Sequence, residues 1–265
     1  MIYPRVCVVV SYWTGHKLQI LERLLGQMLK FNAGMPFDLV VVCNGGDQQP
    51  LVLRDRFRLL RARVINRENA GYNLGAWNAG WEIAPGYDYY LFLQDECFIK
   101  KTGWVSEFVF RMENDSGLGL LGETIMWDNM TWTYVRLATD RDLGLDWFKG
   151  EDMHPLDFYQ HYLKEHNIPP GEVGEHIQTL IVFTSNKILS EIGGLPVGNT
   201  YREVVACEIG LSALVRSKGY RISKVKDQSY TLLGHSQWTA FDRMKRKTRA
   251  YIVGSIKRAI ACVKP

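Results

Sequence analysis

The sequence has few cysteines and no long apolar run. Its cysteines are widely spaced and form no C-x-x-C pair, which argues against a zinc knuckle and a disulfide framework; they are Cys7, Cys43, Cys97, Cys207 and Cys262. No stretch reaches the length of a membrane-spanning helix, and the apolar start of the chain leads into Ser-Tyr-Trp instead of a small-residue cleavage site. We therefore expect a cytoplasmic protein without a signal peptide.

Internal repeats and low-complexity segments are also absent. The chain has 265 residues, of which 46% are hydrophobic and 23% charged, as in an ordinary globular protein. A chain of this length suits one large domain or two small ones.

Positive charge is concentrated at the C-terminal end. Eight of the 32 Lys and Arg residues lie in residues 241–265, together with one of the 28 acids, Asp242. One interpretation is a helix that packs its apolar face on the body and leaves its basic side chains in solvent. The other is a helix that rests on an anionic membrane, which would place the protein on the inner face of the cell membrane. Because no recognition motif accompanies the charge, we expect no nucleic-acid partner.

The first hundred residues alternate strand and helix patterns. Apolar runs typical of buried strands occupy residues 5–13, 37–46, 62–69 and 87–99. Helical spacing of apolar side chains predicts helices at 17–31, at 51–60 and up to Ala84. This order predicts an α/β fold with an open, Rossmann-like, mostly parallel mixed sheet and helices on both faces.

The second half is less regular. Its patterns predict strands within 117–127 and at 179–185 and 220–225, and helices at 104–112 and 204–219. Ser185 has the position of an N-cap for a short helix that stops at Gly193. Residues 127–170 are rich in aromatic and charged side chains with weak periodicity, and we interpret them as a substrate-facing lobe.

Two carboxylates, Asp95 and Glu96, interrupt the last of the early apolar runs. In an open α/β sheet, ligands bind beyond the carboxyl ends of the strands, where these side chains are expected to lie. Adjacent like charges raise each other's pKa unless a cation compensates, and Mg²⁺ or Mn²⁺ is commonly held between such carboxylates and substrate phosphates. The alternative is a solvated acidic pair in which Asp95 caps the next turn.

A Gly- and Asn-rich segment, residues 67–80, precedes that strand. It contains Gly71, Gly75 and Gly80 and the asparagines Asn69, Asn73 and Asn78. The glycines would let a helix approach a neighbouring backbone, and the amides suit the hydroxyls and phosphates of a nucleotide sugar. The glycine spacing is neither G-x-G-x-x-G nor G-x-x-x-x-G-K-[ST], so a dinucleotide loop and a P-loop are not predicted here. A tightly packed helix would explain the glycines but not the asparagines.

Six motifs follow one another through most of residues 5–225. They are VVVSYW, VVVCNGG, NAGYNLGAWNAG, YLFLQDEC, LIVFTSNKILSEIGGLP and CEIGLSALVRSKGY. In this order they resemble the family 2 inverting glycosyltransferases of the GT-A fold, in particular bacterial enzymes of polysaccharide and lipopolysaccharide biosynthesis. The resemblance implies a GT-A domain at 1–240 followed by a basic tail at 241–265. Within the domain, the nucleotide-sugar-binding half would occupy about 1–100 and a less regular acceptor-binding half about 101–240.

The resemblance also implies a reaction and the residues that perform it. A hexosyl or deoxyhexosyl group would pass, with inversion, from a nucleoside-diphosphate donor to a hydroxyl of a glycan or lipid-linked acceptor. Asp95 would contact the ribose or the metal, Glu96 would be the principal ligand of Mg²⁺ or Mn²⁺, and His235 would lie near that metal. Glu208 would be the catalytic base, with Glu203 as the alternative. The nucleotide sugar would be lined by Ser11, Tyr12, Asn44, Asn69, Gly71, Asn73, Gly75, Asn78 and Asp95.

The chain departs from the family motifs at four positions. Each stands where the family usually has an acidic residue; they are Cys43, Gln94, Cys207 and Gly210. One alternative is therefore a catalytically degenerate GT-A domain that serves as a binding or scaffold subunit. A sugar nucleotidyltransferase is another, although the segment SYWTGHK offers only Gly15 and Lys17 of the Gly-rich basic loop that such an enzyme needs.

Overall fold

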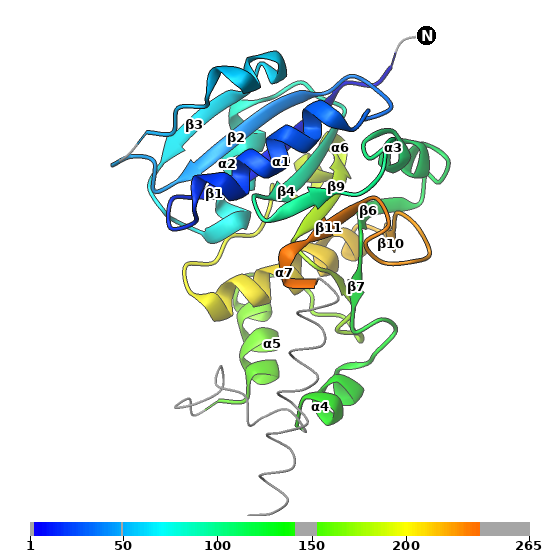
Figure 1. Ribbon diagram of the computed structural model, residues 1–265. Coiled ribbons are helices and arrows are strands. Elements are labelled where there is room, and N and C mark those ends of the chain that lie inside the picture. The colour runs from blue at the N-terminus through cyan, green and yellow to red at the C-terminus, as the bar shows by residue number, and fades with distance from the viewer. Residues whose placement is uncertain (1–2, 49, 141–152, 239–265) are drawn as a thin grey trace, which may run out of the picture.

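A seven-stranded sheet runs through the computed structural model, which describes residues 3–48, 50–140 and 153–238 (Figure 1). In spatial order its strands are β10 (Arg221–Lys224), β6 (Leu118–Gly122), β9 (Ile181–Ser185), β4 (Tyr89–Gln94), β1 (Val6–Trp13), β2 (Asp38–Asn44) and β3 (Arg63–Arg67). All of these strands run in one direction except β9, which is antiparallel to both β4 and β6. The predicted mostly parallel, mixed sheet is therefore confirmed.

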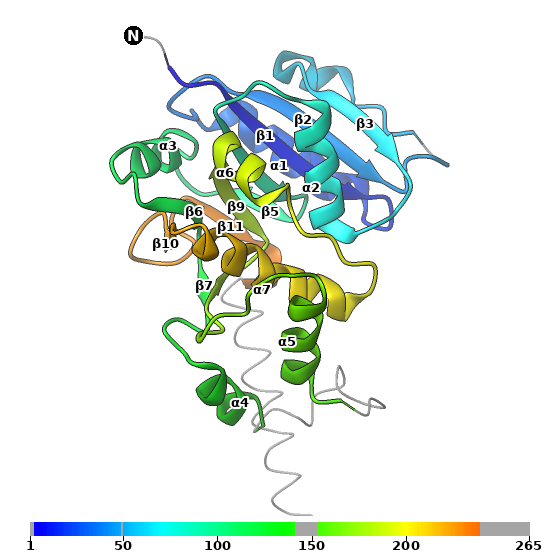
Figure 2. The same cartoon turned by 180° about the vertical axis from the view of Figure 1, so that it is seen from behind.

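Helices cover both faces of this sheet (Figures 1 and 2). One face carries α1 (Leu18–Lys30) and α3 (Ser106–Glu113), and the other carries α2 (Tyr72–Ile83), α6 (Asn186–Ile192) and α7 (Tyr201–Ser217). Both faces of β1 are covered, which explains why its sequence is an unbroken apolar run. Val8 and Val10 belong to the core beneath α1, whereas Cys7 and Val9 belong to the core beneath α2. Since alternate side chains of a strand face opposite sides, a strand covered twice is apolar throughout.

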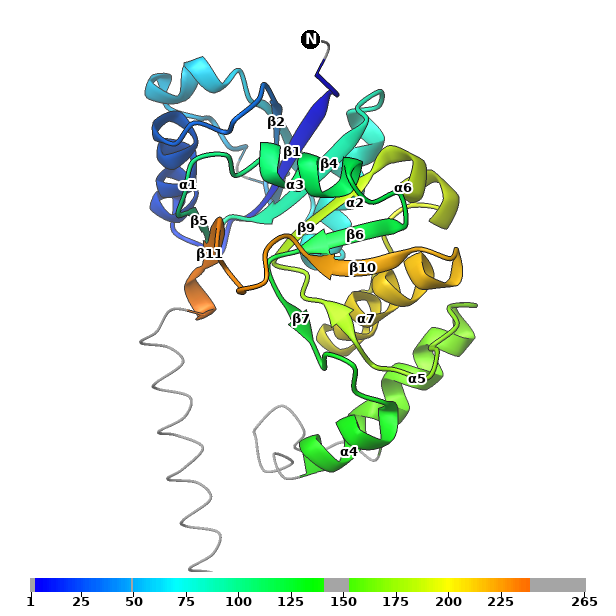
Figure 3. The ribbon, with the colours of Figure 1, turned by 90° about the vertical axis from the view of Figure 1, so that its right-hand side faces the viewer.

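Two short antiparallel ladders lie outside the main sheet. They pair β5 (Cys97–Ile99) with β11 (Leu233–His235) and β7 (Ile125–Met126) with β8 (His176–Ile177). Next to β7, the chain forms α4 (Trp132–Asp140) and later α5 (Pro155–Glu165), which lie beyond one end of the sheet (Figure 3).

The described part of residues 127–170 is more regular than predicted. In α5, Leu156, Tyr159 and Leu163 repeat at helical spacing and are buried in the core that α7 shares. The further aromatic residues between them, Phe158 and Tyr162, and the polar Asp157, Gln160 and His161 obscured this stripe in the sequence.

The helix predicted at 51–60 is shorter than expected. Its helical part is a 3-10 helix, η1 (Asp55–Leu60), which is followed by Arg61 in the left-handed conformation (φ 46°). Phe57 is the buried residue of η1, so the segment lacks the apolar stripe that stabilises a longer helix. A second 3-10 segment, η3 (Ser236–Trp238), follows β11.

The ends of α6 agree with the prediction. The Ser185 hydroxyl accepts a hydrogen bond from the N–H of Ile188 (3.2 Å), and Gly193 ends the helix with a φ of 79°. The basic helix expected at 241–265 lies outside the described residues. Among the helices of the described ranges, none has both the length and the apolar character needed to cross a bilayer.

Helix α2 lies very close to the sheet at Gly80. A Cβ at this position would be 2.4 Å from Cγ1 of Val9 and 3.2 Å from Cγ2 of Val42. One turn earlier, the fully buried Trp77 donates from Nε1 to the carbonyl oxygen of Leu93 (3.0 Å) on β4. The close approach at Gly80 therefore sets the depth at which Trp77 reaches the strand that carries the acidic motif.

We expect Gly80→Ala to lower the free energy of unfolding by about 1 kcal/mol or more, because overpacking of a core exceeds the gain in helix propensity. Gly26→Ala in α1 is the matched control. No atom lies within 4 Å of the Cβ it would add, so it should raise stability by about 0.5–1 kcal/mol. Chemical denaturation of both variants tests this, and equal stabilisation by both would contradict the close approach of α2.

Candidate functional site

The carboxyl ends of four parallel strands meet at one edge of the sheet. The register pairs Ser11 of β1 with Gln94 of β4, Trp13 with Asn44 of β2, and Asn44 with Arg67 of β3. Polar side chains that follow different strands in the sequence are thereby brought together, as expected for a ligand site of an open α/β sheet.

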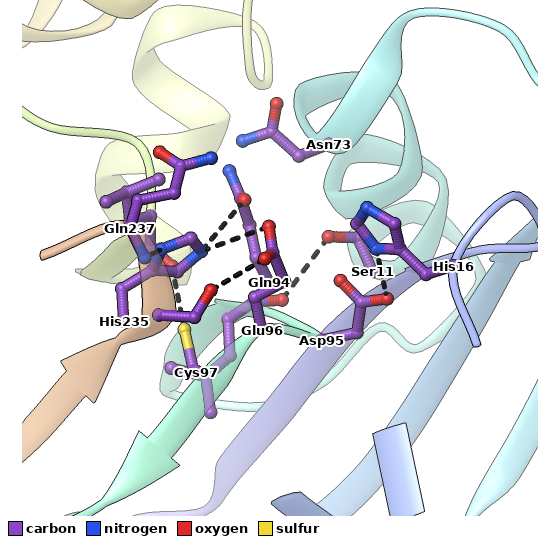
Figure 4. A network of polar contacts seen from close by, with 12 residues as sticks. Ser11, His16, Asn73, Gln94, Asp95, Glu96, Cys97, His235 and Gln237 are labelled. Atoms are coloured by element: carbon purple, nitrogen blue, oxygen red, sulfur yellow. Dashed lines mark hydrogen bonds and ion pairs between the residues drawn. The ribbon is translucent and has the colours of Figure 1, made fainter. Parts of the chain in front are cut away.

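Asp95 forms the first part of the acidic end. It is 3% exposed, and its Oδ2 lies 2.8 Å from Nδ1 of His16, a residue of the loop that leaves β1 (Figure 4). Burial raises the pKa of Asp95, against the opposing effect of His16. The hydrogen bond to Asp95 in turn raises the pKa of His16. The pair therefore binds its proton more tightly than an isolated histidine does.

Glu96 points away from Asp95, toward the end of the described chain (Figure 4). The Ser236 hydroxyl donates to its Oε1 (2.6 Å), and Nε2 of His235 lies 3.9 Å from its Oε2. Its backbone carbonyl accepts from the Arg23 guanidinium (3.1 Å) and from the N–H of Ser236 (3.2 Å). Side chain and backbone of Glu96 are thus both held by neighbouring elements.

His235 lies beside Glu96 because β11 pairs with β5. In this register His235 of β11 is opposite Cys97 of β5, the residue that follows Glu96. The ring is 1% exposed. The N–H of Gln237 donates to its Nδ1 (3.3 Å), so the neutral ring carries its hydrogen on Nε2, which faces Oε1 of Gln94 (3.2 Å). His235 therefore lies beside Glu96, and in this arrangement the nitrogen nearest the carboxylate serves as a hydrogen-bond donor.

A buried carboxylate, Glu123, holds the segment that leads into β11. It is 2% exposed and accepts from the backbone N–H groups of Thr231 (2.6 Å), Leu232 (2.9 Å) and Leu233 (2.7 Å). These three bonds determine where β11 begins, and therefore where His235 and Ser236 meet Glu96.

The Gly- and Asn-rich segment forms the start of α2. Gly71 precedes the helix with a φ of 70°, and a Cβ on Gly75 would lie 2.6 Å from the carbonyl oxygen of Ala70. Asn73 points toward the acidic end and donates to the carbonyl oxygen of Thr179 (2.7 Å). Asn78 instead accepts from the N–H of Leu195 (2.9 Å) on another side of α2, and Asn69 is exposed. Of the three asparagines, Asn73 is the one joined to the polar network.

Glu208 of α7 lies at the other end of this network. Its Oε2 accepts from both the N–H (2.7 Å) and the hydroxyl of Thr179, and its Oε1 lies 3.3 Å from Nε2 of His176. Burial alone would raise the pKa of Glu208, but the hydrogen bonds from His176 and Thr179 bring it below its ordinary value. The side chain keeps 18% exposure, so part of it can be approached from solvent.

Glu203, the alternative base, is used differently. Its carboxylate accepts from the N–H groups of Asn199 (2.7 Å) and Thr200 (3.2 Å), and Thr200 accepts from its N–H in return. This reciprocal pattern is a capping box that starts α7. Glu203 and Glu208 therefore lie on different parts of the helix with different partners.

Thr179 connects the two ends of the site. Its carbonyl oxygen accepts from Nε2 of Gln94 (2.8 Å) as well as from Asn73, while its N–H and hydroxyl donate to Glu208. Gln94 continues the row through His235. A connected series of polar contacts thus runs from Glu96 to Glu208 across the edge of the sheet.

At the carboxyl ends of β2 and β3, two buried polar atoms have no partner among the described residues. They are Oδ1 of Asn44 and Nη1 of Arg67, which lie on paired residues of β2 and β3. The Asn44 amide nitrogen is already used, since it donates to the carbonyl oxygen of Tyr72 (2.8 Å). A buried polar atom without a partner in the protein is expected to be satisfied by a ligand or by water.

Ser11 and Tyr12 make local contacts. The Ser11 hydroxyl donates to the carbonyl oxygen of Leu93 (3.4 Å), and the Tyr12 hydroxyl donates to the carbonyl oxygen of His16 (3.0 Å). Tyr12 therefore shapes the loop that carries His16.

The oxygen donors of Asp95 and Glu96 are of the kind that Mg²⁺ and Mn²⁺ prefer. Across the described part of the chain, no three His, Cys, Asp or Glu side chains are arranged to hold a metal ion. A divalent cation at this edge would therefore take its remaining ligands from substrate phosphates and water, as Mg²⁺ commonly does. The Asp95 and Glu96 carboxylates face different neighbours, His16 and Ser236, so each would contribute to such a site separately and not as one chelating pair.

The four departures from the family motifs have structural roles here or lie in the core. Gln94 both donates to Thr179 and accepts opposite His235, which a carboxylate cannot do. Gly210 lets α5 approach α7, since a Cβ there would lie 2.8 Å from Cδ2 of Leu163. Cys207 is buried at the same contact, and Cys43 is buried in the core beneath α1.

No protein-family model matches the chain, and no curated protein matches its sequence. Solved structures do match its fold. One is the mannosyltransferase PcManGT from Pyrobaculum calidifontis in complex with GDP-Man and Mn²⁺ (TM-score 0.54, 14% identity, 85% of this chain and 56% of that one). Another is residues 1–349 of TarS from S. aureus (TM-score 0.52, 14% identity, 85% and 59%). The chain spans a little more than half of each, and it has the expected GT-A fold.

Several residues of the site carry no clear signal in the sequence. His16 lies where a ligand loop is expected, just after the first strand, and could have been found by that position alone. His176, Thr179 and Ser236 are single polar residues in unremarkable surroundings, and their partners are far away in the chain. Only the folded arrangement shows that they belong together.

We expect Glu123→Gln to lower the free energy of unfolding by about 1–3 kcal/mol, because its amide would present hydrogens to backbone N–H groups that need an acceptor. Glu82→Gln is the control, since Glu82 is exposed and accepts one bond from Asn78, which glutamine can also accept. It should change stability by no more than about 0.5 kcal/mol. Urea denaturation measures both; equal stability of the two variants would show that Glu123 does not hold β11.

Proposed function

We propose that the chain is an inverting glycosyltransferase of the family 2 type, which transfers a sugar from a nucleoside-diphosphate donor to a hydroxyl of a glycan or lipid-linked acceptor. The observation that carries this proposal is the row of contacts from Glu96 through Gln94 and Thr179 to Glu208. It joins an acidic strand end, suited to a diphosphate and its cation, to a charged carboxylate suited to an acceptor hydroxyl. The GT-A fold supports the same reading.

Glu96, which lies beside His235, would be the principal ligand of Mg²⁺ or Mn²⁺, and Asp95, which faces His16 instead, would contact the ribose or the metal from its own side. When bound, such a cation supplies positive charge that stabilises the departing diphosphate. The His16 and Asp95 pair borders the same place and keeps Asp95 oriented. Asn73 and the N-terminal turn of α2 would contact the donor from the other side, since helix N-termini favour phosphate groups.

Glu208 would act as the general base. It would take the proton of the acceptor hydroxyl while that oxygen attacks the anomeric carbon from the face opposite the diphosphate. The bond from the anomeric carbon to the diphosphate breaks as the new glycosidic bond forms, which inverts the configuration. Glu208 suits this role better than Glu203, whose carboxylate already caps α7.

The acceptor would lie between Glu208 and the described part of residues 127–170, which we interpret as a substrate-facing lobe. Trp127 and Trp132 pack edge to face there (ring centroids 6.2 Å apart) and offer aromatic surface of the kind that lines ligand sites. A lipid-linked acceptor would agree with a peripheral position on the inner face of the cell membrane and with synthesis of bacterial polysaccharide or lipopolysaccharide.

A binding or scaffold subunit and a sugar nucleotidyltransferase remain the alternatives, and a donor screen separates all three. The protein is incubated with UDP-, GDP- and dTDP-sugars and Mn²⁺, and both binding and release of the nucleoside diphosphate are measured. A transferase binds a donor and releases the diphosphate, whereas a scaffold binds without turnover. Formation of a nucleotide sugar from a nucleoside triphosphate and a sugar phosphate would identify a nucleotidyltransferase. Absence of donor binding would overturn the proposal.

Glu96→Ala and Glu208→Gln should separate the two ends of the site. We expect Glu96→Ala to abolish the Mn²⁺-dependent part of donor binding, because it removes the proposed cation ligand. Glu208→Gln should bind the donor as the wild type does and lose about 100-fold or more in transfer, because it removes the base. Calorimetry and product analysis measure these effects.

Glu165→Gln, at an exposed position of α5, is the control for both variants and should change neither property. Transfer by Glu208→Gln at the wild-type rate would refute the base assignment. Undiminished Mn²⁺ dependence in Glu96→Ala would refute the cation assignment.

Asn44→Ala should weaken donor binding about three- to tenfold, because a buried acceptor that the nucleotide would satisfy is removed. The loss should appear equally with a nucleoside diphosphate that lacks the sugar. Calorimetric titration with UDP and GDP checks both statements. A variant that binds these nucleotides as tightly as the wild type would show that Asn44 does not face the nucleoside.

A further inference from the structure

His176 is a buried histidine whose two ring nitrogens are both engaged. It is 3% exposed, and its Nδ1 lies 2.8 Å from the carbonyl oxygen of Gly174. Because a carbonyl can only accept, Nδ1 carries a hydrogen. The other nitrogen, Nε2, lies 3.3 Å from Oε1 of Glu208. A hydrogen bond from Nε2 to this carboxylate therefore requires a hydrogen on Nε2 as well.

The plane of the His176 ring is set by a third neighbour, Trp127. The two rings meet edge to face with centroids 5.0 Å apart. Trp127 adopts a φ of 52°, a left-handed conformation that is costly for a bulky residue. Gly174 makes room for this indole, since a Cβ there would lie 3.0 Å from its Cε3. The strained turn therefore places the indole against the histidine.

The carboxylate of Glu208 receives three donors from the short segment that contains His176 and Thr179. Two of them, both from Thr179, go to Oε2, and the third, from His176, goes to Oε1. A carboxylate has about four lone-pair sites, so one remains on Oε1. That is the site available to a hydroxyl that approaches through the exposed part of the side chain.

The other ionisable groups near His176 and Glu208 do not stabilise the charge of the Glu208 carboxylate. Tyr159 of α5 is buried, which raises the pKa of its phenol, and the charge of Glu208 adds to that effect. Glu175, next to His176 in the chain, accepts from the N–H of Asn129 (2.8 Å) and lies 3.9 Å from the Arg216 guanidinium. The hydrogen bonds and charge that lower the pKa of Glu208 come from His176 and Thr179.

We infer that His176 is a positioning residue for Glu208: with Thr179 it keeps the carboxylate charged, fixes its orientation and leaves one lone pair for the acceptor hydroxyl. This inference rests on the proposed function for its catalytic meaning, but the contact itself is testable without substrate. His176 does not touch the reacting atoms. It acts through Glu208, and Trp127 links its orientation to the acceptor-binding lobe.

The test is a titration of the Glu208 carboxylate by NMR, with ¹³C-labelled glutamate and Glu208→Gln to assign its signal. In His176→Gln, which keeps a neutral donor, we expect the pKa of Glu208 to rise by about one unit or more, because a neighbouring positive charge is lost. Thr179→Val keeps the backbone donors and loses the hydroxyl, and should give a smaller rise. His161→Gln, at an exposed position of α5, is the control and should leave the pKa unchanged.

Transfer assays of the same variants connect the contact to catalysis. The acidic limb of the pH profile of kcat/KM should move to higher pH in His176→Gln by the same amount as the NMR titration, with transfer recovering at high pH and donor binding unchanged. An unmoved Glu208 titration in a folded His176→Gln protein would overturn the inference. If the titration moves but Glu208→Gln still transfers sugar, the proposed base fails and the His176 contact stands.

Discussion

The candidate site depends on the hydrogen bonds made by the backbone and the hydroxyl of Thr179. Its carbonyl oxygen accepts from the amides of Asn73 (2.7 Å) and Gln94 (2.8 Å), while its N–H and hydroxyl donate to Glu208. Thr179 is 3% exposed, so each of these groups would be a buried unsatisfied polar group without its partner, at about 1–3 kcal/mol each. One residue thereby holds α2, β4 and α7 in a single arrangement.

The reversed direction of β9 explains why Thr179 can do this. In the register of β4 and β9, Leu93 faces Ile181, so the start of β9 lies beside the carboxyl end of β4. A parallel strand would have placed its start at the opposite edge, far from Gln94. The antiparallel strand brings the residues just before it, His176 and Thr179, to the edge where the parallel strands end. Sheet topology thus brings His176 and Thr179 to the same edge as the polar ends of β1, β2 and β4.

The sequence was sufficient wherever the information is local. Buried strands are apolar throughout, and Asp95 and Glu96 stand out because they interrupt such a run, so the sheet and its acidic end were predicted. The contacts of Thr179 and His176 depend on which strand is reversed and how far apart α5 and α7 pack, and neither follows from spacing along the chain. Gln94 shows what the motif alone could not reveal. In the motif it merely stands where the family usually has an acidic residue, whereas in the fold its amide donates to Thr179 and accepts opposite His235.

The two ends of the row place their carboxylates in opposite environments. At one end burial raises the pKa of Asp95, which shares a proton with His16. At the other, donors from His176 and Thr179 lower the pKa of Glu208 although it too is largely buried. Environments that push the pKa values of two acids apart assign them different roles. A proton-binding pair suits the place where negative charge leaves, and a carboxylate that stays ionised suits the place where a hydroxyl must lose its proton.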